Sequence, residues 1–232
     1  MLELFPEGFE EAEAPGGLEL AAYTAASGER RLRRAFDGIA SRPVPADWAD
    51  RWRQFHTGVR VGRFWIGPPW EQPPADALAV VIDPGQAFGT GAHATTRLCL
   101  ELLGSCERGS LLDAGCGSGV LAIAAAKLRF GPILALDSDP AAVEAARDNA
   151  GRNGVALVVR KADALVEPLP VVDVAVANLT LRAIQALAPR LSARLLIASG
   201  YLEDEAPQPG RFERRERRTS EGWAADVFER AD

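Results

Sequence analysis

From residue 78 onward, short apolar runs alternate with amphipathic stretches whose apolar residues recur at helical spacing. Strands that are apolar on both faces and are separated by helices form a parallel sheet that helices cover on both sides. The alternation therefore predicts an α/β fold with a doubly wound, mostly parallel sheet and an antiparallel edge hairpin in which 223–228 is the returning strand. The other predicted strands are 78–82, 110–114, 133–137, 156–160, 172–177 and 194–199, and the predicted helices are 95–103, 120–128, 140–153 and 181–187.

Residues 1–74 lack this alternation and predict a different organisation. Residues 1–42 contain one apolar run and one arginine-rich stretch with helical spacing, which predicts a small, incomplete α+β region. Residues 43–74 hold six of the sixteen prolines and four of the five tryptophans, so we interpret them as a connecting arm whose tryptophans dock onto the main body. The predicted division is therefore 1–42, 43–74 and a main domain at 75–232.

Charge and composition disfavour several classes of protein. A formal net charge of −6 argues against sequence-independent binding to a nucleic-acid backbone, so we expect no direct nucleic-acid partner. No stretch reaches the roughly 18 uncharged apolar residues that span a bilayer, so we expect no membrane partner. The three cysteines and two histidines lack metal-ligand spacing, which disfavours a metal site and fits reduced thiols in the cytoplasm.

The clearest functional motif is a glycine-rich turn between a predicted strand and a predicted helix, in the sequence LLDAGCGSG at 111–119. Because glycine has no Cβ, a ligand can approach the backbone closely there. Asp137 ends the next predicted strand, 22 residues after Gly115. A carboxylate in this position accepts the ribose hydroxyls of an adenosine-containing cofactor. The motif predicts a nucleoside-binding site that includes Gly115, Gly117 and Asp137.

Two nucleoside cofactors fit this arrangement. A dinucleotide fingerprint has its third glycine three residues after the second and holds a pyrophosphate at the helix N-terminus. Here the spacing is Gly-x-Gly-x-Gly, with Asp113 two residues before the first glycine. S-adenosylmethionine has no phosphate, its carboxylate suits the positive end of the helix, and Asp113 can meet its ammonium group, directly or through water. The spacing favours S-adenosylmethionine, and a nicotinamide cofactor is the alternative.

The sequences LLDAGCGSGVLAIAAAKL and ALDSDPAAVEAARDNAGRNG resemble the cofactor-binding half of the class I, seven-stranded, Rossmann-like methyltransferases. The run IDPGQAFGTGAHATTR at 82–97 resembles the corresponding loop of the ribosomal protein L11 methyltransferases. Residues 47–52, the aromatic run at 64–66 and the sequence VANL at 176–179 also resemble that family. The four motifs occur in the right order, and the resemblance covers residues 43–200.

The resemblance implies roles for individual residues. Asn178 would lie where methyl donor and acceptor amine meet, and would also contact the cofactor. Asp163 would lie beside the adenine, although an acid there often only caps a helix. His93 matches the loop pattern, either as a base or, as we expect, as a residue that orders the loop. Thr95 and Thr96 could alternatively serve only to cap the helix that follows. The other cofactor contacts that the resemblance implies are Phe88, Thr96, Gly115, Gly117 and Asp137.

The resemblance implies a protein methyltransferase that moves methyl groups from S-adenosylmethionine to lysine or α-amino groups of ribosomal protein L11. One alternative is a lysine methyltransferase that acts on another protein, such as an electron-transfer flavoprotein subunit. A second is a nicotinamide-dependent oxidoreductase, which the glycine spacing and the absence of a second nucleotide-binding half disfavour. A third is a non-catalytic nucleoside-binding module that uses the arm as an interaction surface.

Overall fold

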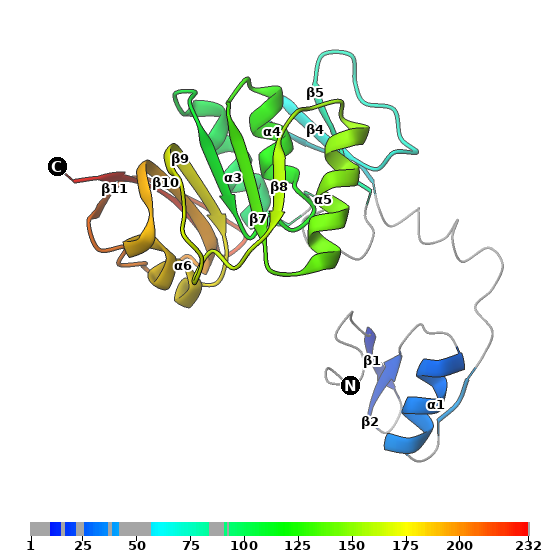
Figure 1. Cartoon of the computed structure of the whole chain (residues 1–232). Coiled ribbons are helices and arrows are strands. Elements are labelled where there is room, and N and C mark those ends of the chain that lie inside the picture. The colour runs from blue at the N-terminus through cyan, green and yellow to red at the C-terminus, as the bar shows by residue number, and fades with distance from the viewer. Residues whose placement is uncertain are drawn as a thin grey trace. The chain divides into compact units, whose positions relative to one another are not determined.

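The chain divides into two compact units, Met1–Phe55 and His56–Asp232 (Figure 1). The boundary falls inside the segment that we predict to be a connecting arm, so residues 57–74 belong to the larger unit. Phe88 and the 47–52 motif lie outside the residues that the structure describes. The computed structural model describes residues 10–14, 17–21, 26–36, 39–41, 57–83, 91 and 93–231.

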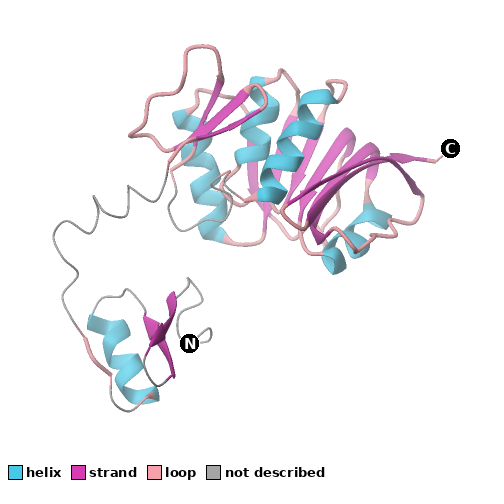
Figure 2. Cartoon of the chain, turned by 180° about the vertical axis from the view of Figure 1, so that it is seen from behind, coloured by secondary structure: helices cyan, strands magenta, loops and turns pink. Residues whose placement is uncertain are grey.

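The described part of the smaller unit contains a hairpin and a helix (Figure 2). Strands β1 (Glu10–Ala14) and β2 (Gly17–Ala21) pair in antiparallel fashion, and α1 (Ala26–Ala35) follows. Glu29 on α1 accepts hydrogen bonds of 2.8 Å from both Arg33 and Ser41. These bonds connect the segment after the helix to its exposed face. The sequence predicts β2 and α1, whereas β1 has no apolar run to mark it.

The larger unit is built on a seven-stranded sheet with the strand order β11-β12-β10-β9-β6-β7-β8. Strands β10, β9, β6, β7 and β8 pair in parallel, whereas β12 is antiparallel to both β10 and β11. This mostly parallel sheet confirms the predicted fold class. Its strands are β6 (Leu111–Ala114), β7 (Ile133–Asp137), β8 (Val158–Lys161), β9 (Val171–Asn178), β10 (Ser192–Leu202), β11 (Phe212–Ser220) and β12 (Trp223–Arg230).

Helices cover both faces of this sheet (Figures 1 and 2). Three helices pack on one face of the sheet, against every second side chain of the central strands. They are α3 (Ala94–Ser105), α4 (Val120–Lys127) and α5 (Pro140–Arg152). On the other face, α6 (Leu181–Leu187) and the short 3-10 helix η1 (Ala188–Arg190) pack over the remaining side chains. Because successive residues of a strand point to opposite faces, the apolar strands require a core on each side.

A second, three-stranded sheet corrects one prediction. Strand β5 (Leu78–Val81) was expected in the main sheet, but it pairs in parallel with β4 (Phe64–Gly67), which pairs in antiparallel fashion with β3 (Val59–Val61). The apolar run of β5 predicts a buried strand correctly but carries no information about which strand it pairs with. Strand β4 is buried along its whole length, so the aromatic run at 64–66 forms core.

A buried carboxylate anchors the antiparallel edge of the main sheet. Asp226 on β12 is fully buried, and it accepts a 2.7 Å hydrogen bond from the hydroxyl of Tyr201 on β10. The Arg217 side chain of β11 lies 3.1 Å from the other carboxylate oxygen. A buried charge is stabilised only when it is paired and hydrogen-bonded. The three side chains therefore join three neighbouring strands at an edge where residues 203–211 form no helix.

Within the described ranges, no helix combines the length and the apolar character that crossing a membrane requires.

Candidate active site

The glycine-rich turn connects β6 to α4 at the carboxyl end of the strand. Gly115, Gly117 and Gly119 have φ angles of 75°, 52° and 81°, a region that side-chain-bearing residues rarely adopt. A Cβ on Gly115 would lie only 2.5 Å from the side chain of Leu179, which follows β9. The turn therefore requires glycine for its backbone conformation, and a side chain at Gly115 would also displace the end of the Leu179 side chain.

Asp137 is fixed against this turn. One of its carboxylate oxygens accepts a 2.9 Å hydrogen bond from the backbone N–H of Gly117, and the other accepts one of 3.0 Å from that of Asp139. The N-terminus of α5 is capped by Asp139, whose side chain accepts from Ala141 at 2.9 Å. Asp137 is therefore not needed as the helix cap. Each of its oxygens retains a lone pair that can accept a further hydrogen bond.

Asp113 lies beneath the turn, on the face of β6 that α3 and α4 cover. Its side chain is 1% exposed, and one carboxylate oxygen accepts a 3.0 Å hydrogen bond from the N–H of Ala122. The other oxygen has no hydrogen-bond partner among the described residues. The pKa of Asp113 is raised to about 7, chiefly by burial and in smaller part by the nearby charge of Asp137, against the lowering effect of the Ala122 bond. A cationic or hydrogen-bonding group beside that oxygen would relieve an otherwise unsatisfied buried charge.

Asn178 ends β9 and meets the start of α3. Its side-chain amide nitrogen donates to the hydroxyl oxygens of Thr95 at 3.2 Å and Thr96 at 3.3 Å. Both threonines are almost completely buried. These bonds join residues that are 83 and 82 positions apart in the chain. The structure thus brings together two residues predicted for the site, Asn178 and Thr96, and orients the amide of Asn178.

The residue that caps α3 is His93, not either threonine. The Nδ1 atom of His93 accepts the N–H of Thr95 at 3.4 Å and lies 2.8 Å from the Thr95 hydroxyl. The ring packs edge-on against Trp223 of β12, with 4.9 Å between the ring centroids. The alternative that the threonines only cap the helix is therefore wrong. Their hydroxyl oxygens accept hydrogen bonds from Asn178, and His93 caps the start of the helix.

The other two predicted contacts lie apart from this cluster or outside the described residues. Asp163 follows β8 and is exposed, and its carboxylate accepts a 2.8 Å hydrogen bond from the N–H of Leu165. This bond closes a local turn, and the carboxylate has further lone pairs. Phe88 belongs to the segment that the structure does not describe, so its contact with a cofactor stays a prediction.

Asn149 of α5 and Asn153, the residue that ends this helix, fix neighbouring segments although the sequence analysis did not select them. Asn149 is 1% exposed, donates to the carbonyl oxygen of Ser118 in the glycine turn at 3.0 Å, and accepts from the N–H of Asp83 at 3.0 Å. Asn153 donates to the carbonyl oxygen of Val81 at 2.6 Å and accepts its N–H at 2.9 Å. Asparagine is a poor helix former, so Asn149 inside a predicted helix was an available signal.

The sheet order, the glycine turn and the carboxylate at the next strand end together define a Rossmann-like methyltransferase. The same fold is found in a ribosomal protein L11 methylase from Lactobacillus delbrueckii subsp. bulgaricus, which is 28% identical with a TM-score of 0.67 over 76% of this chain and 100% of that one. A putative RNA methyltransferase from Pyrococcus horikoshii, 17% identical, shares the fold alone, with a TM-score of 0.53 over 64% of this chain and 88% of its own.

Sequence relatives identify the family. The family model for ribosomal protein L11 methyltransferase (PrmA) matches residues 29–229. Ribosomal protein L11 methyltransferases from Pelobacter propionicus and Pelotomaculum thermopropionicum are 41% and 42% identical over 83% and 81% of this chain. The chain therefore belongs to the ribosomal protein L11 methyltransferase family, which confirms the resemblance. It spans 70% and 64% of the length of these two relatives and 59% of that of the relative from Aeromonas hydrophila.

Proposed function

We propose that the protein transfers methyl groups from S-adenosylmethionine to lysine or α-amino groups of ribosomal protein L11. Its membership in the family supports this proposal. The observation that carries it is the cluster in which the amide of Asn178 is held by Thr95 and Thr96 at the carboxyl edge of the sheet. Ligands of open α/β sheets bind at this edge.

The residues around the turn fit S-adenosylmethionine. Asp137 offers carboxylate lone pairs to the two ribose hydroxyls, and Gly115 and Gly117 keep side chains out of the turn. The unpartnered oxygen of Asp113 is a buried acceptor that suits an ammonium group, directly or through water. Thr96, Phe88 and Asp163 would supply the remaining contacts. When bound, S-adenosylmethionine supplies an electrophilic methyl group on a sulfonium.

The role of Asn178 follows from the way its amide is held. Thr95 can donate its hydroxyl proton to Nδ1 of His93, so its oxygen remains an acceptor for the amide N–H₂ of Asn178. The side-chain carbonyl oxygen of Asn178 makes no hydrogen bond within the part of the chain that the structure describes. That oxygen can accept a hydrogen bond from an incoming amine and align its lone pair for in-line displacement.

The neutrality of Asn178 suits a lysine substrate. A lysine amine has a pKa near 10.4, so almost all of it is protonated and not nucleophilic at neutral pH. A carboxylate in place of Asn178 would stabilise that protonated form and raise its pKa further. The amide orients the amine without stabilising its positive charge. Asn178 is therefore our candidate for the catalytic residue.

The domain division remains part of the proposal. Residues 1–42 would present the protein substrate, 43–74 would connect, and 75–232 would bind the cofactor and carry out transfer. The glycine turn, Asp137 and the threonines all follow residue 82. Deleting residues 1–42 should leave cofactor affinity nearly unchanged and strongly reduce L11 methylation. Equal methylation by the deletion variant would contradict a presenting role.

The test of function is incubation with methyl-labelled S-adenosylmethionine and an extract from cells that lack L11 methylation. Label on L11, located by mass spectrometry on lysine or the α-amino group, supports the proposal. Asn178→Ala serves as the inactive control. Label on another protein would indicate a different protein substrate, and label only on nucleic acid or small molecules would refute a protein methyltransferase. Separate calorimetric titrations with S-adenosylmethionine and NAD distinguish the two cofactor classes.

A further inference from the structure

A cavity of about 550 Å³ lies at the amino ends of β6 and β7, at the opposite end of these strands from the glycine turn. Arg108 enters its lining from the segment before β6, and Lys127 and Arg129 enter from the end of α4. Arg63 enters from the turn between β3 and β4. The four-residue length of β6 separates this pocket from the turn by about 13 Å. We call it the basic pocket.

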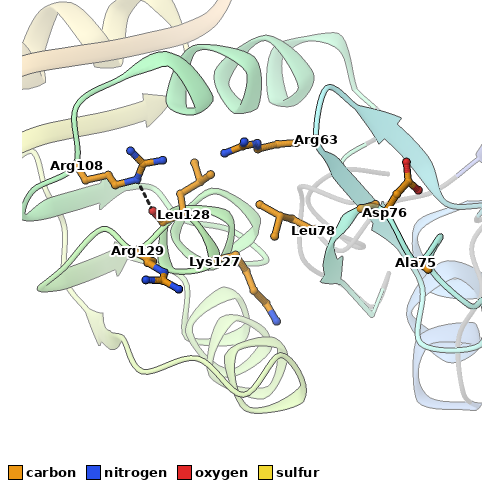
Figure 3. A pocket seen from close by; sticks show the side chains of 9 residues that line it. Arg63, Ala75, Asp76, Leu78, Arg108, Lys127, Leu128 and Arg129 are labelled. Carbon is orange, nitrogen blue, oxygen red and sulfur yellow. Dashed lines mark hydrogen bonds between the residues drawn. The ribbon is translucent and has the colours of Figure 1, made fainter.

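The positive charge of the basic pocket is not neutralised by its own lining. Its one carboxylate, Asp76, already accepts two hydrogen bonds from Arg60, of 3.0 and 2.8 Å. The carboxylate of Asp76 also points away from the four cations (Figure 3). The chain as a whole has a net charge of −6, so the four cations here contrast with its overall acidic character.

Arg63 and Arg108 face a shared space, whereas the side chains of Lys127 and Arg129 extend away from it (Figure 3). Figure 3 shows the guanidinium groups of Arg63 and Arg108 pointing toward each other with Leu128 between them. Arg108 donates only its Nε–H, to the carbonyl oxygen of Leu128 at 2.7 Å, so its side chain is held while both terminal amino groups remain available. Lys127 donates one of its three protons to the carbonyl oxygen of Asn153 at 2.9 Å. The side chains of Arg63 and Arg129 make no hydrogen bond or ion pair within the described ranges.

Arg129 occupies a backbone position that favours glycine. Its φ angle is 70°, directly after α4, where helices commonly end with a glycine in the left-handed conformation. Its N–H donates to Ala126 at 2.9 Å, and that of Phe130 donates to Ala125 at 3.0 Å, which holds the conformation. Glycine would satisfy the same bonds without strain. The arginine adds a positive charge to the basic pocket, although its side chain makes this backbone conformation strained.

We propose that the basic pocket binds a ligand that carries two or more phosphate groups. A single carboxylate would leave most of the positive charge unmatched, whereas neighbouring phosphates offer several charges and pair with guanidinium groups through two parallel hydrogen bonds. The leucines at 78 and 128 provide apolar surface beside the cations for a sugar or base. The cavity volume lies in the range of small-molecule sites. The phosphates could belong to a free nucleotide or to consecutive positions of an RNA strand.

The test is calorimetric titration of the full-length protein at low salt with pyrophosphate, cytidine diphosphate and a short single-stranded oligoribonucleotide. Cytidine diphosphate lacks the adenine that the cofactor site would accept. We expect binding that weakens as salt is added. Comparable affinity for cytidine diphosphate and the oligonucleotide identifies a free nucleotide as the ligand, and much tighter binding of the oligonucleotide identifies RNA. Absence of binding by all three phosphate compounds would overturn the proposal.

Matched variants locate the binding. Arg63→Gln and Arg108→Gln should each weaken binding about tenfold, because each removes charge-assisted hydrogen bonds. Arg108→Lys keeps the charge but not the paired donors and should lie between Arg108→Gln and the native protein. Arg230→Gln, at an exposed arginine on β12, removes the same charge outside the pocket and should have little effect.

Two further results would refute the proposal. Equal binding by native protein and by the Arg63→Gln/Arg108→Gln double variant would place the ligand elsewhere. Tighter binding of a glutamate-rich peptide than of pyrophosphate would show that the pocket prefers carboxylates. The double variant should methylate its protein substrate normally, so loss of phosphate binding and failure of the methyltransferase proposal give different results.

Discussion

The two ends of strand β6 differ in charge because α4 runs back across the sheet from one end to the other. At the carboxyl end, the glycine turn leads into the helix N-terminus, and the carboxylates of Asp113 and Asp137 hydrogen-bond to backbone N–H groups there. At the amino end, α4 terminates, and Arg108 and Lys127 donate to backbone carbonyl oxygens nearby. The helix dipole favours anions at its start and cations at its end. One strand–turn–helix unit thus creates an acidic site and a basic one.

Asn178 belongs only to the carboxyl edge of the sheet, so its replacement should affect methyl transfer and leave the basic pocket intact. Asn178→Ala should lower the single-turnover methylation rate by roughly 100-fold or more, because a contact that positions the reacting amine is lost. Rapid-quench measurement with saturating cofactor checks this. Phosphate binding in the basic pocket should be unchanged. A variant that binds cofactor and methylates at the native rate would show that Asn178 only ends its strand.

Asn149 should matter for both the stability and the cofactor affinity of the carboxyl edge. Asn149→Ala removes the hydrogen bonds that its side chain makes with the carbonyl oxygen of Ser118 and the N–H of Asp83, so we expect the free energy of unfolding to fall by about 2 kcal/mol. Urea titration measures this change. Asn153→Ala is the matched control, since it removes bonds to Val81 but none to the turn. Only Asn149→Ala should also weaken cofactor binding, and equal cofactor affinity in the two variants would argue against a link to the turn.

Asp137 should contribute to cofactor affinity in addition to the stability that its two backbone hydrogen bonds supply. Asp137→Ala should raise the dissociation constant for S-adenosylmethionine at least about tenfold, the effect of losing one or two charge-assisted hydrogen bonds. Calorimetry measures the change. Asp139→Ala provides the control, because it removes the cap of α5 at about 1 kcal/mol of stability and leaves the ribose acceptor in place. Unchanged affinity in a folded Asp137→Ala variant would mean that the ribose binds elsewhere.

Asp113 should make the stability of the cofactor-free protein depend on pH. Its pKa is raised from 3.8 to about 7 in the folded state, so the folded protein binds the proton more tightly than the unfolded chain. Stability is then fully present below the unfolded pKa and is lost as pH rises to about 7, with a slope of up to about 1.4 kcal/mol per pH unit. Urea titrations over this range should show the slope in the native protein and a smaller one in Asp113→Asn. Parallel curves for the two proteins would mean that Asp113 ionises normally.

Arg129 should give the smallest effect and acts at the amino end. Arg129→Gly should raise the free energy of unfolding by about 1 kcal/mol, because the left-handed conformation no longer carries a side chain. Arg129→Ala is the matched control, since it removes the charge but keeps the strain. Both variants should weaken phosphate binding, and only the glycine variant should be more stable by thermal unfolding. Loss of stability in Arg129→Gly would show that the side chain is needed structurally.

The amino-acid sequence by itself determined the features that depend on neighbours along the chain. Apolar runs and helical spacing predict the strands of the main sheet, and the glycine turn with Asp137 predicts the nucleoside site, because strand, turn and helix follow one another directly. Asn178 is predicted at a strand end for the same reason, since VANL closes an apolar run. Strands β1 and β11 escaped this reasoning because neither contains an apolar run. The sheet in which β5 takes part also escaped it, because an apolar strand does not specify its partner.

The tertiary structure alone decided which distant residues meet. The amide of Asn178 donates hydrogen bonds to threonines that are 82 and 83 positions away in the chain. The side chain of Asn149 forms hydrogen bonds with two residues that are 31 and 66 positions away from it. The arginines of the basic pocket likewise come from three separate segments. In the sequence, each of these arginines resembles an ordinary solvated surface residue. Such contacts depend on how the helices cross the sheet, and this packing is set by the burial of the whole core rather than by any local pattern.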